Sequence, residues 1–179
     1  MDILEAIKNR RSIRRYSHQE ISDQDLKKIA EMAHWAPSAG NINPRYYISI
    51  KNPEMIEAIK SLSPGMFGNP TAVMLLCADK AKAEEKASTN GYIYSIMDVA
   101  MAAQNMLLAA HALALGACVI RSFHAQAIGK LLGLPEHIVP ELIVALGFPE
   151  GDLPKGIRND LSEIYHQECY KGSIGNGKR

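Results

Sequence analysis

Apolar residues recur along the chain at two spacings, one typical of helices and one typical of strands. Ser22, followed by Asp25, has the pattern of a helix N-cap. The predicted helices are 3–7, 22–36, 53–62, 80–89 (a helix and a loose connection), 92–115, 125–132 and 160–170, and the predicted strands are 46–50, 71–78, 117–120 and 141–146. Because helices separate the strands, we expect one mixed or mostly covered sheet in a three-layer α/β or α+β domain.

The longest of these segments, residues 92–115, is almost uncharged, and Asp98 is its only ionised residue. As one helix it would be about 36 Å long, which is enough to span a membrane. Gln104, Asn105 and His111 interrupt the run, and no basic flank marks an orientation. This pattern favours a helix that is buried in a core or in a dimer interface over a membrane span.

Length and charge limit the classes of protein that the chain can represent. The 179 residues are typical of a single domain, 1–179, in which the glycine-rich residues 172–179 form a flexible tail. The 20 Lys and Arg residues against 19 Asp and Glu residues argue against a general nucleic-acid binder. The first residues are acidic and lack a secretory signal, so we expect a cytoplasmic protein. Cys77, Cys118 and Cys169 are widely spaced, which predicts reduced thiols and no metal site.

Four arginines, Arg10, Arg11, Arg14 and Arg15, occupy six positions around Ser12. Guanidinium groups bind phosphate oxygens in pairs, and a cluster of them is costly unless an anion lies between its members. An extended segment would place Arg10, Ser12 and Arg14 on one side and Arg11 and Arg15 on the other. A helical segment would instead pair Arg10 with Arg14 and Arg11 with Arg15. The segment is therefore either a phosphate-binding site or a solvated basic face.

Two loops carry residue types that suit a binding site. Residues 37–44, which we call the proline loop, are small and polar and lie between two prolines. Residues 63–70 are rich in Gly and Pro and carry Met66 and Phe67, which we expect to be exposed. The chain has no G-x-G-x-x-G or Walker-type motif, and Ser38 lies outside a G-x-S-x-G elbow. A Rossmann dinucleotide site, a P-loop and a serine hydrolase are therefore not indicated, and Ser38 suits the role of a hydrogen-bond donor.

These features fit flavin mononucleotide (FMN), which needs forked cations for its phosphate, small polar donors for its ribityl chain and a positive charge at the pyrimidine edge. Five motifs follow one another: Arg10-Arg11-Ser12-Ile13-Arg14, Trp35 to Asn41 with Asn43-Pro44, DVAMAAQNMLLAAH at 98–111, residues 116–123, and 132–135 continued by 146–149. In these motifs and their order the chain resembles the nitroreductase family of FMN-dependent NAD(P)H oxidoreductases, in its short form. The resemblance covers the chain from the first helix to about residue 166.

The resemblance implies a site without a catalytic side chain, in which the flavin carries the chemistry and Arg14 stabilises its reduced anion. The arginine segment and two later basic residues would hold the phosphate and ribityl end. The proline loop would reach the flavin of the other subunit, and the backbone of 120–122 would approach flavin N5 or the dimethylbenzene side. The residues implied to contact FMN are Arg10, Arg11, Ser12, Arg14, Pro37, Ser38, Ala39, Asn41, Ile120, Arg121, Ser122, Lys155 and Arg158.

The same resemblance implies an α+β sandwich with a mixed, mostly antiparallel sheet flanked by helices, a long central helix, and a homodimer with FMN at its interface. NAD(P)H would reduce the flavin, leave, and be replaced by a nitroaromatic compound, a quinone or a similar small acceptor. A flavin-binding sensor or carrier with little turnover would share these motifs. A nucleic-acid module would use the arginines without a flavin and is the third alternative.

Three departures from the family pattern concern the substrate. Arg45 follows Pro44 where many members have an aromatic residue, and Val119-Ile120-Arg121 replaces Trp-Ile-Gly or a similar small residue. The segment before the long helix is short, which leaves Met66 and Phe67 as the lid candidates. Arg121 would favour an anionic substrate or the extra phosphate of NADPH, or it would point outward.

Overall fold

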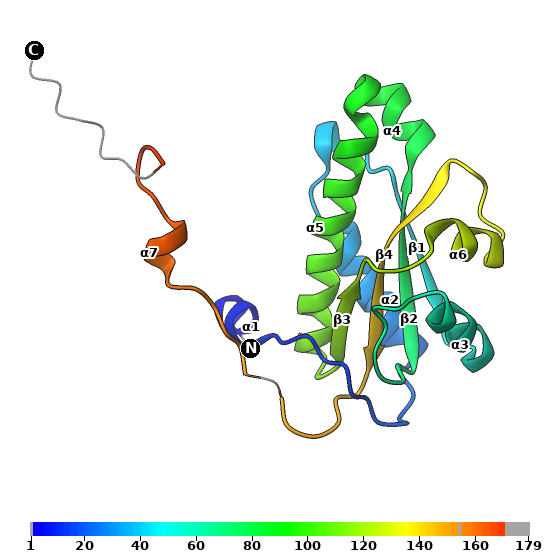
Figure 1. Ribbon diagram of the computed structural model, residues 1–179, viewed down its shortest axis with the longest axis vertical. Helices are drawn as coiled ribbons and strands as arrows, with labels where there is room; N and C mark the ends of the chain where they lie inside the picture. Colours follow the sequence, from blue (N-terminus) through cyan, green and yellow to red (C-terminus); the bar gives the residue numbers. More distant parts are fainter. Residues whose placement is uncertain (1, 154, 171–179) are drawn as a thin grey trace, which may run out of the picture.

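An antiparallel four-stranded sheet lies at the centre of the protein, whose computed structural model describes residues 2–153 and 155–170 (Figure 1). Its strands are β1 (Arg45–Ile50), β2 (Ala72–Asp79), β3 (Gly116–Ile120) and β4 (Ile138–Gly147), in the order β1-β2-β4-β3. Ser12 adds a parallel bridge to Ala117 of β3. The sheet is therefore mixed and mostly antiparallel, as the sequence predicted.

Strand β2 is buried along its whole length and separates two halves of the core. Its even-numbered side chains pack with α2 (Asp23–His34) and α5 (Gly91–Ala112), and its odd-numbered side chains pack with α3 (Pro53–Ser61) and α6 (Ala125–Leu131). Successive residues of a strand point to opposite faces, so helices cover the sheet on both sides. This arrangement confirms the predicted three-layer α+β sandwich.

Helix α5 is the long central helix, and its bounds are close to the predicted 92–115. Val99, Ala102 and Met106 are fully buried against α2 and the sheet. The helical stretch Lys80–Ala112, which includes α5, is long and apolar enough to cross a membrane by length and composition, but the side of α5 that faces α2 and the sheet is buried, as in a core helix of a globular domain. Ile93 and Met97 lie on a different side of the helix and are exposed.

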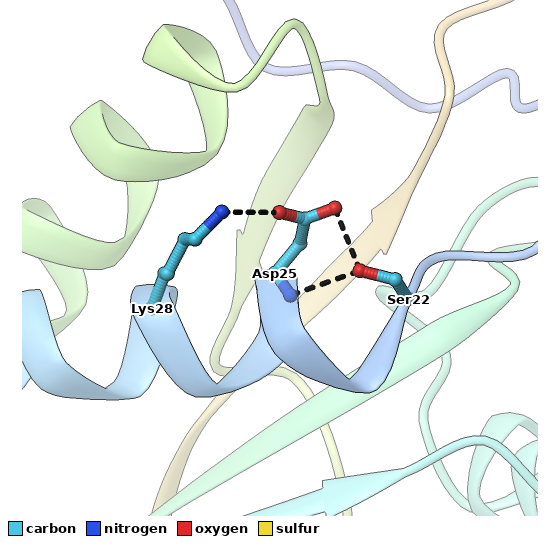
Figure 2. A network of polar contacts seen from close by, with 3 residues as sticks. All are labelled: Ser22, Asp25 and Lys28. Carbon is cyan, nitrogen blue, oxygen red and sulfur yellow. Dashed lines mark hydrogen bonds and ion pairs between the residues drawn. The ribbon is translucent and has the colours of Figure 1, made fainter.

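Ser22 caps the N-terminus of α2, as its spacing from Asp25 predicted. The Asp25 amide donates to Ser22 Oγ at 3.0 Å, and Lys28 Nζ lies 3.2 Å from the Asp25 carboxylate (Figure 2). Ser22 Oγ also donates to the Asp25 carboxylate at 2.8 Å. These hydrogen bonds, first from Ser22 and then from Lys28, hold the pKa of Asp25 below its usual value.

The remaining elements are short: α1 (Ile3–Asn9), α4 (Lys80–Ala87), α7 (Leu161–Ile164) and the 3₁₀ turns η1 (Ala39–Asn41) and η2 (Ser88–Asn90). The segment after β4 runs past α1 and away from the sheet, with α7 beyond it (Figure 1). The predicted helix at 160–170 is wrong except for this single turn. Its residues Leu161 and Ile164 stay exposed, and a short helix without a packed face is marginal in water. The predicted tail, 172–179, lies outside the described residues.

The loop between α3 and β2 differs from its prediction at one residue. Met66 is 5% exposed and packs into the core beneath α3 and α6, so the expectation that it is exposed is wrong. Phe67 is 59% exposed, as predicted. Only Phe67 therefore remains a lid candidate in this loop.

Candidate functional site

Residues 10–16 run extended beside β3, which decides between the two conformations considered for the arginine segment. The Ile13 amide donates to a carbonyl of β3 at 3.0 Å. Ile13 and Tyr16 are buried, and they lie over Gly116 and Gly147, where a Cβ atom would come within 2.7 Å of them. The two glycines therefore allow the segment to pack onto the sheet while the arginines project from it.

Three guanidinium groups meet at the start of this segment. Burial lowers the pKa of Arg10, and the positive charges of Arg158 and Arg11 lower it further. Within the described ranges, Arg10 Nη1 is buried without a hydrogen-bond acceptor, and none of the three arginines forms an ion pair with a carboxylate. Clustered cations are costly unless an anion lies among them. The residues present therefore fit an anionic group such as a phosphate.

The arginines of the segment line two different cavities. Arg10 and Arg11 line one cavity of about 270 Å³, and Ser12, Arg14 and Arg15 line another of about 250 Å³. Arg11 Nη1 donates to two carbonyls at the end of α1, at 2.6 and 2.9 Å. Unsatisfied carbonyls at a helix C-terminus attract cations, so Arg11 stays beside Arg10. Arg11 and Arg15 nevertheless both face the segment after β4, because Cβ atoms at Gly156 and Gly151 would lie 2.7 and 3.2 Å from their guanidinium groups. Arg10 and Arg14 instead lie near Cys118. These contacts agree with the alternation predicted for an extended segment.

Arg10 and Arg14 both lie close to Cys118 of β3. Burial raises the pKa of the Cys118 thiol, and the charges of Arg14 and Arg10 oppose that rise. The two arginines therefore flank this buried thiol although they line different cavities. The sequence indicated only a core position for Cys118.

The two later basic residues lie in the exposed segment after β4. Arg158 is close enough to Arg10 to lower its pKa, and Arg158 Nη1 donates to the Ile157 carbonyl at 2.7 Å. Gly156 passes the Arg11 guanidinium so closely that a Cβ atom would lie 2.7 Å from it. The structure thus brings Arg158 to the arginine segment. Lys155 is exposed, and no side-chain hydrogen bond or ion pair joins it to the described part of the chain.

The proline loop is held in an unusual backbone conformation. Asn41 and Asn43 have φ angles of 54° and 51°, in the left-handed region that non-glycine residues rarely adopt. Ser38 Oγ accepts a hydrogen bond from the Asn43 amide at 2.8 Å, and the Ala39 amide donates to the Asp98 carboxylate of α5 at 3.0 Å. Backbone strain that the surroundings maintain is typical of functional loops.

Arg45 secures this loop. Its guanidinium donates to the carbonyls of Ala36 at 2.9 Å, Pro37 at 3.2 Å and Asp98 at 3.2 Å, and to Asn43 Oδ1 at 2.7 Å. Since four acceptors of the protein use its donors, Arg45 fixes the proline loop to α5. The sequence placed Arg45 at a substrate-related position but showed nothing of these partners.

The end of β3 presents open backbone groups. Ile120 is buried, whereas Arg121 and Ser122 are exposed. The Gly65 amide donates to the Ser122 carbonyl at 3.2 Å, but the amides of Arg121 and Ser122 donate no hydrogen bond to any residue that the structure describes. Both amides are therefore available to an acceptor on a ligand. The Arg121 guanidinium lies 3.5 Å from the buried carboxylate of Glu141.

The proline loop and the arginine segment meet α5 at different points. The loop is bonded to Asp98, whereas Arg10 and Arg11 share their cavity with His111 near the end of the helix. The rise of an α-helix separates Asp98 from His111 by about 20 Å. The two predicted motifs therefore do not form one compact site within a single chain. His111 Nε2 is also buried without a partner in residues 2–153 and 155–170, a feature that its apolar helix did not indicate.

Comparison with known proteins decides the family. The model of the nitroreductase family matches residues 7–63 and 57–148. The chain belongs to the nitroreductase family. A family relative from Methanothermobacter thermautotrophicus, named NADH dehydrogenase/NAD(P)H nitroreductase, is 36% identical over 155 residues, which cover 83% of this chain and 78% of that protein. The FMN reductase (NADPH) of Bacillus subtilis is 27% identical over 187 residues, which cover 93% of this chain and 74% of that protein.

Solved structures of the nitroreductase family share the fold. A nitroreductase from Desulfovibrio desulfuricans, solved in complex with FMN, has a TM-score of 0.81 and 27% sequence identity, over 95% of this chain and 98% of that chain. The likeness extends over nearly all of both chains. The family predicted from the five sequence motifs is therefore confirmed.

Proposed function

We propose that this nitroreductase-family protein is an FMN-dependent oxidoreductase that transfers electrons from NAD(P)H to a small acceptor, such as a nitroaromatic compound or a quinone. The names of its relatives, an NAD(P)H nitroreductase and an FMN reductase, support the cofactor and the reaction class. The observation that carries the proposal is the cluster of Arg10, Arg11 and Arg158, which lacks a carboxylate partner among the described residues. A phosphate among them would satisfy the buried Nη1 atom of Arg10.

Each basic residue has a distinct part in this proposal. The three clustered arginines bind the phosphate of FMN, with Ser12 and Lys155 beside them. Arg14 would lie near the pyrimidine edge of the ring, where its charge would stabilise the reduced, anionic flavin. FMN, when bound, would supply the hydride-transfer chemistry between NAD(P)H and the acceptor. The chain binds and orients the flavin, and no side chain has to transfer a proton.

The flavin ring lies at the end of β3 in this proposal. The open amides of Arg121 and Ser122 can donate to acceptor atoms of the ring, N5 among them, and Ile120 precedes them in the strand. The backbone thus supplies the contact, so the identities of the side chains at these positions are free to vary. This placement agrees with phosphate binding by the arginine segment, because that segment also lies beside β3.

The active unit in this proposal is a homodimer with FMN at its interface. Because about 20 Å of α5 separates the proline loop from the arginine segment, the loop of one chain reaches the flavin held by the other. Exposed apolar residues on α5 (Ile93 and Met97) and on the segment after β4 (Ile157 and Leu161) support an interface. The loop residues that would contact the partner's flavin are Pro37, Ser38, Ala39 and Asn41.

The visible absorbance spectrum of the purified protein tests the proposed function. Flavin bands that bleach when NADH or NADPH is added without oxygen, and that return when a quinone is added, are the expected result. Flavin bands that neither nucleotide bleaches would indicate a sensor or a carrier. A colourless protein that also fails to take up added FMN would overturn the proposal.

A further inference from the structure

Glu141 is a buried carboxylate that the proposed function does not use. It lies on β4 with 1% of its surface exposed. The strand carries a bulge at this residue, because Pro140 pairs with Cys77 and Leu142 pairs with Leu76, which leaves Glu141 without a partner on β2. Bulges re-aim side chains and are over-represented next to active sites.

Two side chains from other elements hold this carboxylate. The hydroxyl of Tyr92, at the start of α5, donates to Oε1, and Nη2 of Arg121 lies 3.5 Å from Oε2. Burial, and then the hydrogen bond to Glu141, raise the pKa of Tyr92 to about 12, so the phenol remains a donor at neutral pH. Lys80 Nζ lies 5.5 Å from the centre of the Tyr92 ring.

Arg121 is thereby fixed at the exposed end of β3. Its guanidinium lies 5.6 Å from the centre of the Phe123 ring, and the Gly65 amide holds the Ser122 carbonyl at 3.2 Å. Residues 120–123 are therefore held by Glu141 through Arg121 and by the 63–70 loop through the backbone. A buried carboxylate is costly even when it is paired, and apolar residues in place of such a pair are often as stable. The pair therefore points to a role besides stability.

We propose that Glu141 is a positioning residue of the flavin site, which acts through Arg121 to fix the backbone of 120–122 and to set the positive charge there. The inference rests on the proposed function, because it needs a flavin beside the end of β3. A cation near the ring favours the reduced, anionic flavin, and the carboxylate of Glu141 offsets part of that effect. The midpoint potential of the bound flavin should therefore depend on both members of the pair.

Two variants that each remove one charge test this inference. Glu141→Gln leaves Arg121 without its counter-charge, so the midpoint potential of bound FMN should rise. Arg121→Gln removes the cation, so the potential should fall. Both changes loosen the end of β3, and FMN should bind roughly three- to tenfold more weakly, which is the scale of coupling between residues in contact. If the pair had a purely structural role, the midpoint potential would not shift in opposite directions in the two variants.

Two further variants serve as controls. Lys80→Gln removes a positive charge near Tyr92 but contacts neither Glu141 nor Arg121, and it should leave both the FMN affinity and the potential at the wild-type values. Arg121→Lys keeps the charge and should bring the potential back toward wild type. Affinity is measured by fluorescence titration of the flavin-free protein with FMN, and the potential by reductive titration of the bound flavin against a redox dye.

Unchanged potentials, or shifts of the same sign in Glu141→Gln and Arg121→Gln, would overturn the inference and leave an ordinary ion pair. If Glu141→Gln does not fold, Arg121→Gln and Arg121→Lys still test the pair, because the Arg121 side chain is 63% exposed and its replacement leaves no cavity. A wild-type potential in Arg121→Gln would then overturn the inference, since Glu141 is proposed to act through the charge of Arg121. A wild-type protein that binds no FMN would refute the proposed function itself, which is a different result.

Discussion

Replacement of Arg10 by alanine should affect the flavin-free and the flavin-bound protein differently. Without flavin, Arg10→Ala removes a guanidinium whose Nη1 is buried without an acceptor and which Arg11 and Arg158 repel. An unsatisfied buried donor costs about 1–3 kcal/mol, and the lost packing of the side-chain stem offsets part of that relief. We therefore expect the flavin-free variant to unfold within about 4 °C of wild type or above it.

With flavin, the same change removes a charge-assisted contact with the phosphate. Such a hydrogen bond contributes about 1.5–3 kcal/mol, which corresponds to roughly 10- to 150-fold weaker FMN binding. Because a ligand stabilises the folded state in proportion to the logarithm of its affinity, the loss lowers the Tm of the flavin-bound protein by about 3–10 °C. Arg10→Ala should therefore separate flavin affinity from intrinsic stability.

Thermal unfolding with and without FMN, together with fluorescence titration of FMN, measures both effects. Arg15→Ala is the matched control, because Arg15 belongs to the same segment but is exposed and lies outside the cluster of three arginines. The reasoning is refuted if Arg10→Ala keeps wild-type FMN affinity, if it destabilises both forms equally, or if Arg15→Ala weakens FMN binding as much.

Three further changes test the scaffold of the site. Ser22→Ala should lower the free energy of unfolding, measured by chemical unfolding, by about 1 kcal/mol. The stability that Asp25 contributes is present above its ordinary pKa of 3.8 and is lost as pH falls through the lowered pKa, so this acid-dependent loss, followed by calorimetry, should be smaller in the variant. Arg45→Ala should lower the free energy of unfolding by about 1.5–3 kcal/mol and make the proline loop more sensitive to proteolysis. Arg45→Lys should not restore the stability of the loop, because an ammonium lacks the guanidinium fork. Unchanged proteolysis would contradict this role of Arg45. Gly68→Ala should lower the Tm more than Gly133→Ala, because both have positive φ but only at Gly68 would the Cβ lie 2.1 Å from a main-chain oxygen; equal losses would contradict this steric reasoning.

The layers of the fold could be predicted because their signals are local. Three of these signals each depend on residues within one element: the continuous apolar run of β2, the Ser22 cap and the apolar length of α5. The start of β4 was predicted at Glu141, directly after Pro140, a residue that has no amide to donate in a strand. The bulge accommodates this proline, and the strand begins at Ile138 instead. The burial of Met66 likewise depends on elements that lie far from it in the sequence.

The candidate site could be predicted in its parts but not in its arrangement. Arginine spacing and family resemblance indicated a phosphate-binding segment, and the structure brings Arg158 to it. The positions of Arg45 and Arg121 depend on Asp98 and Glu141, which are distant in sequence and carry no pairing signal. The arginine spacing also gave no sign that the Arg11 side chain bonds the carbonyls at the end of α1. Patterns of neighbouring residues cannot reveal such tertiary partners.

The measurement that tests the central claim most directly is a comparison of FMN with riboflavin, which has the same ring and ribityl chain but no phosphate. Both ligands are titrated into the flavin-free protein, and quenching of flavin fluorescence reports binding. If Arg10, Arg11 and Arg158 hold the phosphate, FMN should bind at least roughly 100-fold more tightly than riboflavin, and added salt should reduce this preference. Equal affinities for the two flavins at low salt would contradict the account.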